Sequence, residues 1–93
     1  MPDLSLLPPS AAIDGDDLRI GGCPLSEVAA EFGTPAYVFD EQALRKRAAE
    51  YLETMTSRHP RNRACFAVKA FPSVAMISVL VESGLGCDVV GAG

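Results

Sequence analysis

The sequence predicts an α/β fold built on a parallel sheet, and two observations lead to that class. Two apolar segments, residues 64–71 and 87–93, are separated by a single helical pattern. Such a strand, helix, strand unit makes a right-handed crossover, which pairs its two strands in parallel. The run at 64–71 is apolar except for Lys69, as is typical of a parallel strand covered on both faces. A complete (β/α)8 barrel takes about 250 residues, so within any large fold this chain of 93 residues is a fragment.

Composition and charge narrow the classes of function. Hydrophobic residues make up 48% of the chain and charged residues 22%, which is too apolar for intrinsic disorder. Twelve acidic against eight basic residues give a net charge of -4, the wrong sign for binding nucleic acid or an anionic membrane. No stretch reaches the roughly 20 apolar residues of a membrane span, and the acidic start does not resemble a signal peptide. We therefore expect a small molecule or another protein as the partner, with no nucleic acid and no membrane.

The three cysteines, Cys23, Cys65 and Cys87, stand far apart and form no C-x-x-C pair. An odd number of this kind does not form a disulfide framework, so we expect reduced thiols in a cytoplasmic protein. We assign no metal ligand. Cys65 and Cys87 stand at the starts of two predicted strands, where we expect them to be small core residues.

The N-terminal part of the chain divides into an arm, a short strand and a helix. Residues 1–17 combine three prolines with four aspartates, a composition that sustains neither a helix nor a central strand, and predict a flexible arm. A short strand over 18–20 then enters a glycine turn. Apolar residues at i, i+3, i+4 and i+7 predict a helix over 25–32, which Gly33 ends as a C-terminal cap.

A strand and a long helix are predicted next. Residues 36–40, AYVFD, are β-branched and aromatic, which predicts a buried strand. Asp40 then caps a helix that runs to about Ser57, where His59-Pro60 stops it. Its apolar stripe consists of Leu44, Ala48, Tyr51, Leu52 and Met55.

The last predicted helix follows the apolar run. Ser73 is placed to cap it, its residues are apolar almost all round, and Gly84 ends it. An all-round apolar helix predicts burial between layers. The segment CDVVGAG, residues 87–93, then forms a second parallel strand, and two strands are fewer than such a sheet needs. We therefore expect the fold to continue beyond this chain.

Lys69 is the residue whose chemistry stands out. An ammonium in an apolar strand loses hydration, which favours the neutral, nucleophilic amine that Schiff-base chemistry requires. The C-terminal end of a parallel strand is also where α/β folds place their reactive groups. The alternative is that Lys69 simply extends from the strand end into water.

Three segments around Lys69 resemble a known enzyme family. Phe66-Ala67-Val68-Lys69-Ala70-Phe71, with Met76-Ile77, Leu80 and Gly84 at set distances after it, resembles the pyridoxal-phosphate attachment segment of the ornithine, diaminopimelate and arginine decarboxylases. The segment at 33–40, GTPAYVFD, is similar to the part that leads into that family's barrel, and Gly-Thr-Pro at this distance is most similar to the diaminopimelate decarboxylases. Residues 84–90 resemble the family's second barrel strand. Phe71 departs from the asparagine that bacterial relatives often have, and Gly91-Ala92-Gly93 departs from their serine-glycine-glycine.

The resemblance, which covers roughly residues 18–93, implies a larger fold. The chain would be the N-terminal part of a pyridoxal-phosphate-binding (β/α)8 barrel of the alanine-racemase-like type, and the barrel would be joined to a second, β-rich domain. On this basis residues 1–17 are an arm, 18–39 hold the N-terminal strand, helix and lead-in segment, and 40–93 begin the barrel. The strand near 18–20 would then belong to the β-rich domain, and the full-length protein would be a homodimer.

The same resemblance implies a reaction and two site residues. Lys69 is the catalytic residue that carries pyridoxal 5'-phosphate, and the aspartate matching Asp88 lies near that cofactor. The reaction is decarboxylation of an amino acid, foremost meso-diaminopimelate to L-lysine and CO2 in lysine biosynthesis. The alternatives are decarboxylation of arginine, ornithine or a carboxylated polyamine, a noncatalytic relative that binds pyridoxal phosphate, and a small independent binding domain. The 93-residue chain alone is expected to be inactive.

Other polar candidates are expected to serve the surface or the fold. Asp88, early in a predicted buried strand, needs a partner, which is either the cofactor neighbourhood or a backbone donor. His59 lies between a helix end and a proline, which favours an exposed loop residue over a catalytic one. Six basic residues form either a solvated helix face, the interpretation we favour, or a phosphate-binding strip; they are Arg45, Lys46, Arg47, Arg58, Arg61 and Arg63.

Overall fold

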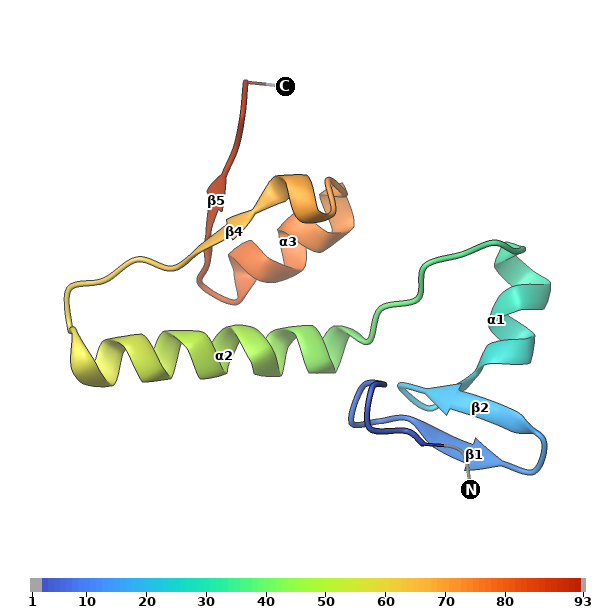
Figure 1. Cartoon of the computed structure of the whole chain (residues 1–93). Coiled ribbons are helices and arrows are strands. Elements are labelled where there is room, and N and C mark those ends of the chain that lie inside the picture. Colours follow the sequence, from blue (N-terminus) through green and yellow to red (C-terminus); the bar gives the residue numbers. More distant parts are fainter. Residues whose placement is uncertain (1–2, 93) are drawn as a thin grey trace. The chain divides into compact units, whose positions relative to one another are not determined.

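The computed structural model describes residues 3–92, which form two compact units divided between Ala43 and Leu44. The first unit holds three short strands and a helix, and the second holds a βαβ unit with a long helix (Figure 1). The long helix begins at Glu41 and continues through the second unit. Among residues 3–92, no helix has both the length and the apolar character that crossing a membrane requires.

An antiparallel meander opens the first unit. Strands β1 (Ala12–Asp14), β2 (Asp17–Ile20) and β3 (Cys23–Pro24) pair in that order. The β1–β2 loop is Gly15-Asp16, and Gly15 has φ 63°, at the position where type II′ turns need glycine. The β2–β3 loop is Gly21-Gly22, and both residues have positive φ, which matches a type I′ turn. Tight glycine turns therefore set the register of both hairpins.

The predicted arm over residues 1–17 is more structured than expected over the part that the structure describes, residues 3–17. The strand expected at 18–20 is confirmed as β2, but β1 pairs with it where we expected no strand. Because β1 lies at the edge of the sheet, it needs only one partner strand, and the composition argument excluded only a central one. The side chain of Arg19 supports this edge, since its Nε lies 2.9 Å from Asp14 Oδ2.

Helix α1 (Leu25–Phe32) has the predicted bounds. Its N-cap residue is Pro24, which makes no side-chain cap bond. Asp17 supplies that bond instead, since its carboxylate accepts hydrogen bonds from the Ser26 amide and hydroxyl. The predicted cap at the other end is confirmed, because Gly33 has φ 83° and donates its N–H to Ala29 O at 2.8 Å.

The strand predicted over 36–40 is wrong for the part of the chain that the structure describes. These residues are not in a strand, and Tyr37 is 85% exposed. A strand requires a neighbour to pair with, and the described sheets place none beside this segment. These residues therefore have the composition of a strand but no strand to pair with.

The second unit contains the predicted parallel βαβ arrangement. Helix α2 (Glu41–Arg58) is followed by β4 (Cys65–Ala67), the 3₁₀ turn η1 (Val68–Ala70), α3 (Val74–Glu82) and β5 (Gly86–Asp88). Strands β4 and β5 pair in parallel, from Cys65↔Gly86 to Ala67↔Asp88. The prediction that α2 ends near Ser57 is confirmed within one residue, and Ser73 caps α3 by accepting the Met76 amide at 3.5 Å.

A small apolar core holds this unit together. Ala48 of α2 and Met76 and Leu80 of α3 are buried in contact with one another. Four half-buried apolar residues pack against them: Leu44, Phe66, Phe71 and Leu85. An exposed ion pair between Arg45 Nη2 and Glu82 Oε2, 2.8 Å apart, also joins the two helices.

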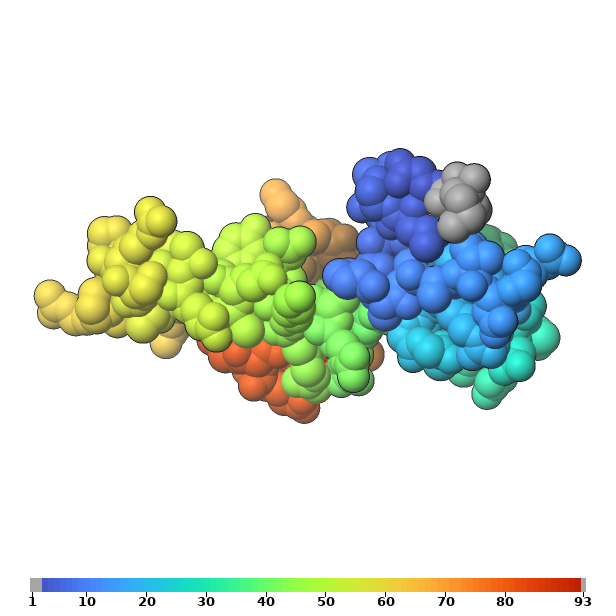
Figure 2. All heavy atoms as spheres, turned by 90° about the horizontal axis from the view of Figure 1, so that it is seen from below, coloured from blue at the N-terminus to red at the C-terminus, as the bar shows by residue number. Residues whose placement is uncertain are grey.

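Two predictions of burial in this unit are wrong for the described chain. Tyr51 and Met55 of the α2 stripe are exposed, and so are Val74 and Val81 of α3, which we expected to lie between layers. Figure 2 shows the side of the unit where α2, in green to yellow, lies uncovered along its length. Two strands and one helix offer too little surface to cover both faces of these helices.

Candidate functional site

Lys69 lies just beyond the carboxyl end of a parallel strand, as predicted, but not within it. Strand β4 ends at Ala67, and residues 68–70 form η1, which Phe71 closes by donating its N–H to Val68 O at 3.1 Å. The predicted strand over 64–71 is therefore shorter. The physical reason is the register, because β5 pairs with β4 only as far as Asp88 and leaves later residues without a neighbour.

The register brings Asp88 to the same edge as Lys69. Asp88 is the last residue of β5 and pairs with Ala67, two residues before Lys69. Both side chains are exposed, and no hydrogen bond or ion pair is recorded for either within residues 3–92. An amine and a carboxyl group thus stand at one end of the two-stranded sheet, the end where α/β folds bind ligands.

Exposure corrects part of the chemical argument for both residues. We expected Lys69 in a dry strand, but its side chain is exposed, which matches the alternative of a lysine extending from the strand end. We likewise expected Asp88 to be buried and paired, and it is neither in the described chain. The order of the strands brings the two together, and the reactivity of Lys69 rests on the family resemblance.

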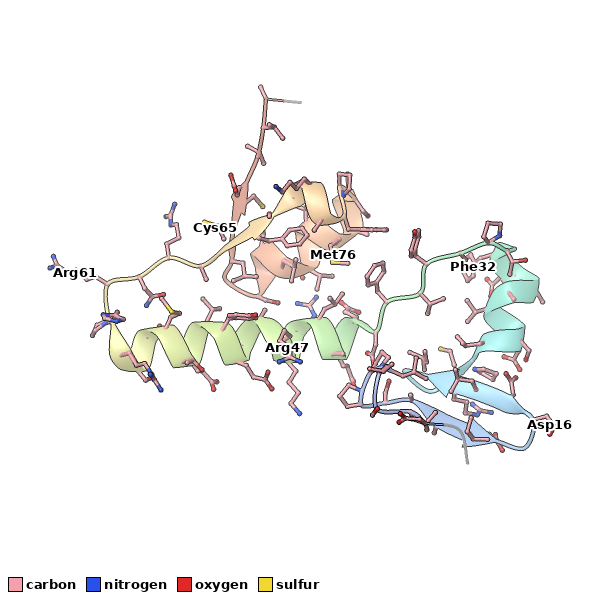
Figure 3. All side chains as sticks on the ribbon, in the orientation of Figure 1. Asp16, Phe32, Arg47, Arg61, Cys65 and Met76 are labelled. Atoms are coloured by element: carbon pink, nitrogen blue, oxygen red, sulfur yellow. The ribbon has the colours of Figure 1, made fainter. Side chains whose placement is uncertain are left out.

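The remaining candidates have mostly structural places. Cys65 is exposed at the start of β4 (Figure 3), which corrects its assignment to the core, and Cys87 is half-buried. All three cysteines are free thiols. His59 is exposed, as expected of a loop residue. Arg61 points away from its unit (Figure 3) and, with the exposed Arg58 and Arg63, fits a solvated surface.

Sequence reasoning missed the network around Asp40. It identified this residue as a helix cap, and Asp40 Oδ1 does accept the amides of Gln42 and Ala43 at 3.0 and 3.3 Å. It did not find Ser10, whose hydroxyl donates to Asp40 Oδ2 and accepts the Gly21 amide at 2.8 Å. Thirty residues separate Ser10 from Asp40, and no local pattern connects them.

The same network fixes the charge of Asp40. Hydrogen bonds from Ser10, Ala43 and Gln42 lower the pKa of the Asp40 carboxyl below its ordinary value, against the opposing effect of burial. A cavity of about 390 Å³ adjoins it, lined by residues of β2, α1, the segment that leads into α2 and the start of α2, including Ile20, Val28 and Phe39. Because three donors hold its carboxylate, two of them amides at the start of α2, we assign Asp40 to the fold and not to acid-base work.

The residues at the carboxyl edge fit the part of a pyridoxal phosphate site that supplies an amine to the cofactor. That cofactor carries an aldehyde, which requires a primary amine free of competing bonds. The Lys69 amine meets this requirement in residues 3–92, because it is exposed and no partner is recorded for it. Asp88 adds a carboxylate at the same edge, a suitable neighbour for a cationic nitrogen.

Comparison with known proteins gives consistent relatives. The chain is 35% identical over 94 residues to the diaminopimelate decarboxylase of Synechocystis sp., covering 99% of this chain and 20% of that protein. It is 41% identical to the Bacillus subtilis enzyme of the same name, over 82% of the chain and 17% of that protein. The Zymomonas mobilis diaminopimelate decarboxylase is also 41% identical, with 82% and 18% covered. No family model matches the chain, and no solved structure matches it.

These relatives carry one name and align along most of this chain, which spans about a fifth of their length. Their agreement joins the three segments around Lys69 to a single family. The chain belongs to the diaminopimelate decarboxylase family and corresponds to an N-terminal portion of its members.

Proposed function

We propose that this chain is part of a pyridoxal-phosphate-dependent decarboxylase that converts meso-diaminopimelate to L-lysine and CO2. The observation that carries the proposal is Lys69, an exposed amine at the carboxyl end of a parallel strand, inside the segment that resembles the family's cofactor attachment site. The relatives' shared name favours diaminopimelate over arginine, ornithine or a carboxylated polyamine as the substrate.

In this proposal Lys69 holds the cofactor and moves a proton. Bound pyridoxal phosphate supplies a ring that accepts the electron pair left on the substrate Cα when CO2 departs. Turn η1 places Lys69 beyond the last paired residue of β4, where its Nζ amine would hold the cofactor. When it is not holding the cofactor, the same Nζ would be the group of this chain that carries a proton to the substrate Cα.

Asp88 has a supporting role in the same proposal. Its carboxylate ends β5 at the edge from which Lys69 extends, and it makes no recorded bond to a residue of the described chain. A carboxylate at this position stabilises a protonated nitrogen close by. In this proposal Asp88 would therefore favour the protonated form of a nitrogen atom of Lys69, the substrate or the cofactor at this edge.

The larger assembly is part of the proposal. We infer a (β/α)8 barrel that begins over residues 40–93, a β-rich domain that includes the strand near 18–20, and a homodimer. Support for the barrel comes from the parallel order of β4, α3 and β5, which is the repeating unit of such a barrel, and support for the β-rich domain comes from the antiparallel meander before it. The homodimer rests on the family resemblance.

Chemical trapping tests the attachment residue directly. The full-length protein carrying this chain is purified with pyridoxal phosphate, reduced with borohydride and mapped by peptide mass spectrometry. Lys46 and Lys69 are the only lysines in the 93-residue sequence, so Lys46→Ala is a matched control. We expect the label on Lys69, its retention in Lys46→Ala and its loss in Lys69→Ala.

Turnover tests the reaction in the same preparations. CO2 release is measured from meso-diaminopimelate, arginine and ornithine. Lys69→Ala is expected to lower turnover at least about a hundredfold, since proton transfer alone contributes that much, while Lys46→Ala leaves it unchanged. A label on another lysine contradicts the site. Faster release from arginine or ornithine contradicts the substrate, and a labelled protein without turnover indicates a noncatalytic relative.

A further inference from the structure

We propose that Phe71 is a positioning residue for Lys69, anchoring the turn that carries the amine to the core of the second unit. The inference rests on the proposed function, because it assumes that Lys69 attaches the cofactor. Phe71 makes no contact with the reacting atoms in this proposal, and it acts through the backbone of η1.

The backbone of Phe71 connects the turn to the following helix. Its N–H closes η1 by donating to Val68 O at 3.1 Å, and its carbonyl accepts the Ser73 amide at 2.9 Å. Ser73 in turn caps α3. The residue two positions after Lys69 is therefore bonded both to the turn and to the start of the helix.

The side chain of Phe71 is the apolar anchor on this side of the turn. It packs against the cluster of Ala48, Met76 and Leu80, as does Phe66 of β4 on the other side of η1. Between these two aromatic anchors, Lys69 and Ala70 are exposed. Attachment of a ligand to an exposed lysine restricts both its side chain and the backbone that carries it. A backbone that is already fixed therefore lowers the entropy cost of attachment.

Leu85 provides a matched control. It packs against the same cluster but lies on the connection from α3 to β5, where its N–H donates to Leu80 O at 3.0 Å. Leu85→Ala therefore weakens the same core without releasing the Lys69 turn. A purely structural role for Phe71 predicts that the two alanine variants behave alike.

The experiment compares the full-length apoproteins of wild type, Phe71→Ala, Phe71→Leu and Leu85→Ala. The rate of pyridoxal phosphate attachment to Lys69 is followed by absorbance, with Tm measured on each protein. Hydrogen exchange is measured at the Phe71 amide. We expect both alanine variants to lower Tm, but only Phe71→Ala to slow attachment, by about 10²-fold, as loss of positioning does elsewhere. Phe71→Leu should restore most of the rate.

The outcomes separate this inference from the proposed function. Equal slowing in Phe71→Ala and Leu85→Ala, or unchanged exchange at the Phe71 amide, contradicts the positioning role and leaves Lys69 as the attachment residue. Attachment to a residue other than Lys69 in the wild type contradicts both. If Phe71→Ala does not fold, Phe71→Val takes its place and is compared with Leu85→Val, and equal slowing of attachment in that pair again overturns the inference.

Discussion

Asp40 shows how one side chain can connect segments that are distant in the sequence. Its carboxylate accepts the hydroxyl of Ser10 and the first amides of α2, while Ser10 accepts the Gly21 amide of the β2–β3 turn. Three separate parts of the first unit thus meet at one carboxylate that is buried beneath them. Hydrogen bonds to an ionised carboxylate are stronger than those to a neutral acceptor, so these bonds depend on Asp40 staying ionised.

Protonating Asp40 should therefore destabilise the protein in acid. The pKa of Asp40 is lowered in the folded state, chiefly by the Ser10 hydroxyl. A lowered folded pKa gives stability that is complete above the unfolded value, about 3.9, and is lost as pH falls through the folded pKa. We expect Asp40→Asn to reduce the fall in Tm of the full-length protein between about pH 5 and pH 3.

The control for this prediction is Asp16→Asn. Asp16 is exposed in the β1–β2 loop, and no bond of its side chain is recorded in residues 3–92. Its replacement should leave the acid profile of Tm close to that of the wild type. If Tm falls equally in Asp40→Asn and the wild type as pH falls, the charge of Asp40 in its bonds to Ser10 and the helix cap does not contribute to the stability of the protein.

At the scale of elements, local chemistry decided which predictions hold. The bounds of α1, the end of α2 and the caps at Gly33, Asp40 and Ser73 agree with the structure, because each depends on neighbours within four residues. The βαβ unit was predictable for a different reason, since its handed crossover restricts how two such strands pair.

Strand length and burial were less predictable, because they depend on partners. Residues 36–40 have strand propensity but no neighbour, and β1 forms at 12–14 because β2 is beside it. Lys69 leaves its strand because β5 stops pairing at Asp88. The place of the candidate site, at the carboxyl edge, was therefore predictable, and the exposure of its side chains was not.

The end of α3 offers a test at this scale. Gly84 follows the helix with φ 102°, and a Cβ built there lies 3.1 Å from Leu52 Cδ1 of α2. We expect Gly84→Ala to destabilise the full-length protein by about 1–2 kcal/mol, mainly from backbone strain. Gly91→Ala is the control, because no atom lies within 4 Å of its added Cβ, and it should change stability by less than about 0.5 kcal/mol. Urea unfolding measures both, and equal effects contradict the strain argument.

At the scale of the whole molecule, the described chain buries little apolar surface. In residues 3–92 the buried apolar side chains are Ala48, Met76 and Leu80, and none of the large side chains is fully enclosed. Many large apolar residues are exposed, among them Val90 at 97% and Val74 at 83%. The relatives are about five times as long, and we propose that the further residues of a protein of that length cover these faces.

This balance predicts that the 93-residue chain fails to fold cooperatively by itself. Burying one large apolar side chain contributes about 1.5–3 kcal/mol, while ordering each residue costs about 1–2 kcal/mol of backbone entropy. Burial of three apolar side chains is therefore far too little to offset the backbone entropy lost by ordering this chain. Strands β4 and β5 each also keep an open edge. We expect the isolated chain to bind a hydrophobic dye and to unfold without a sigmoidal transition in urea, whereas the full-length protein binds little dye and unfolds sharply. A sharp, reversible transition in a monomeric preparation of the 93 residues would show instead that the chain is an independent small domain.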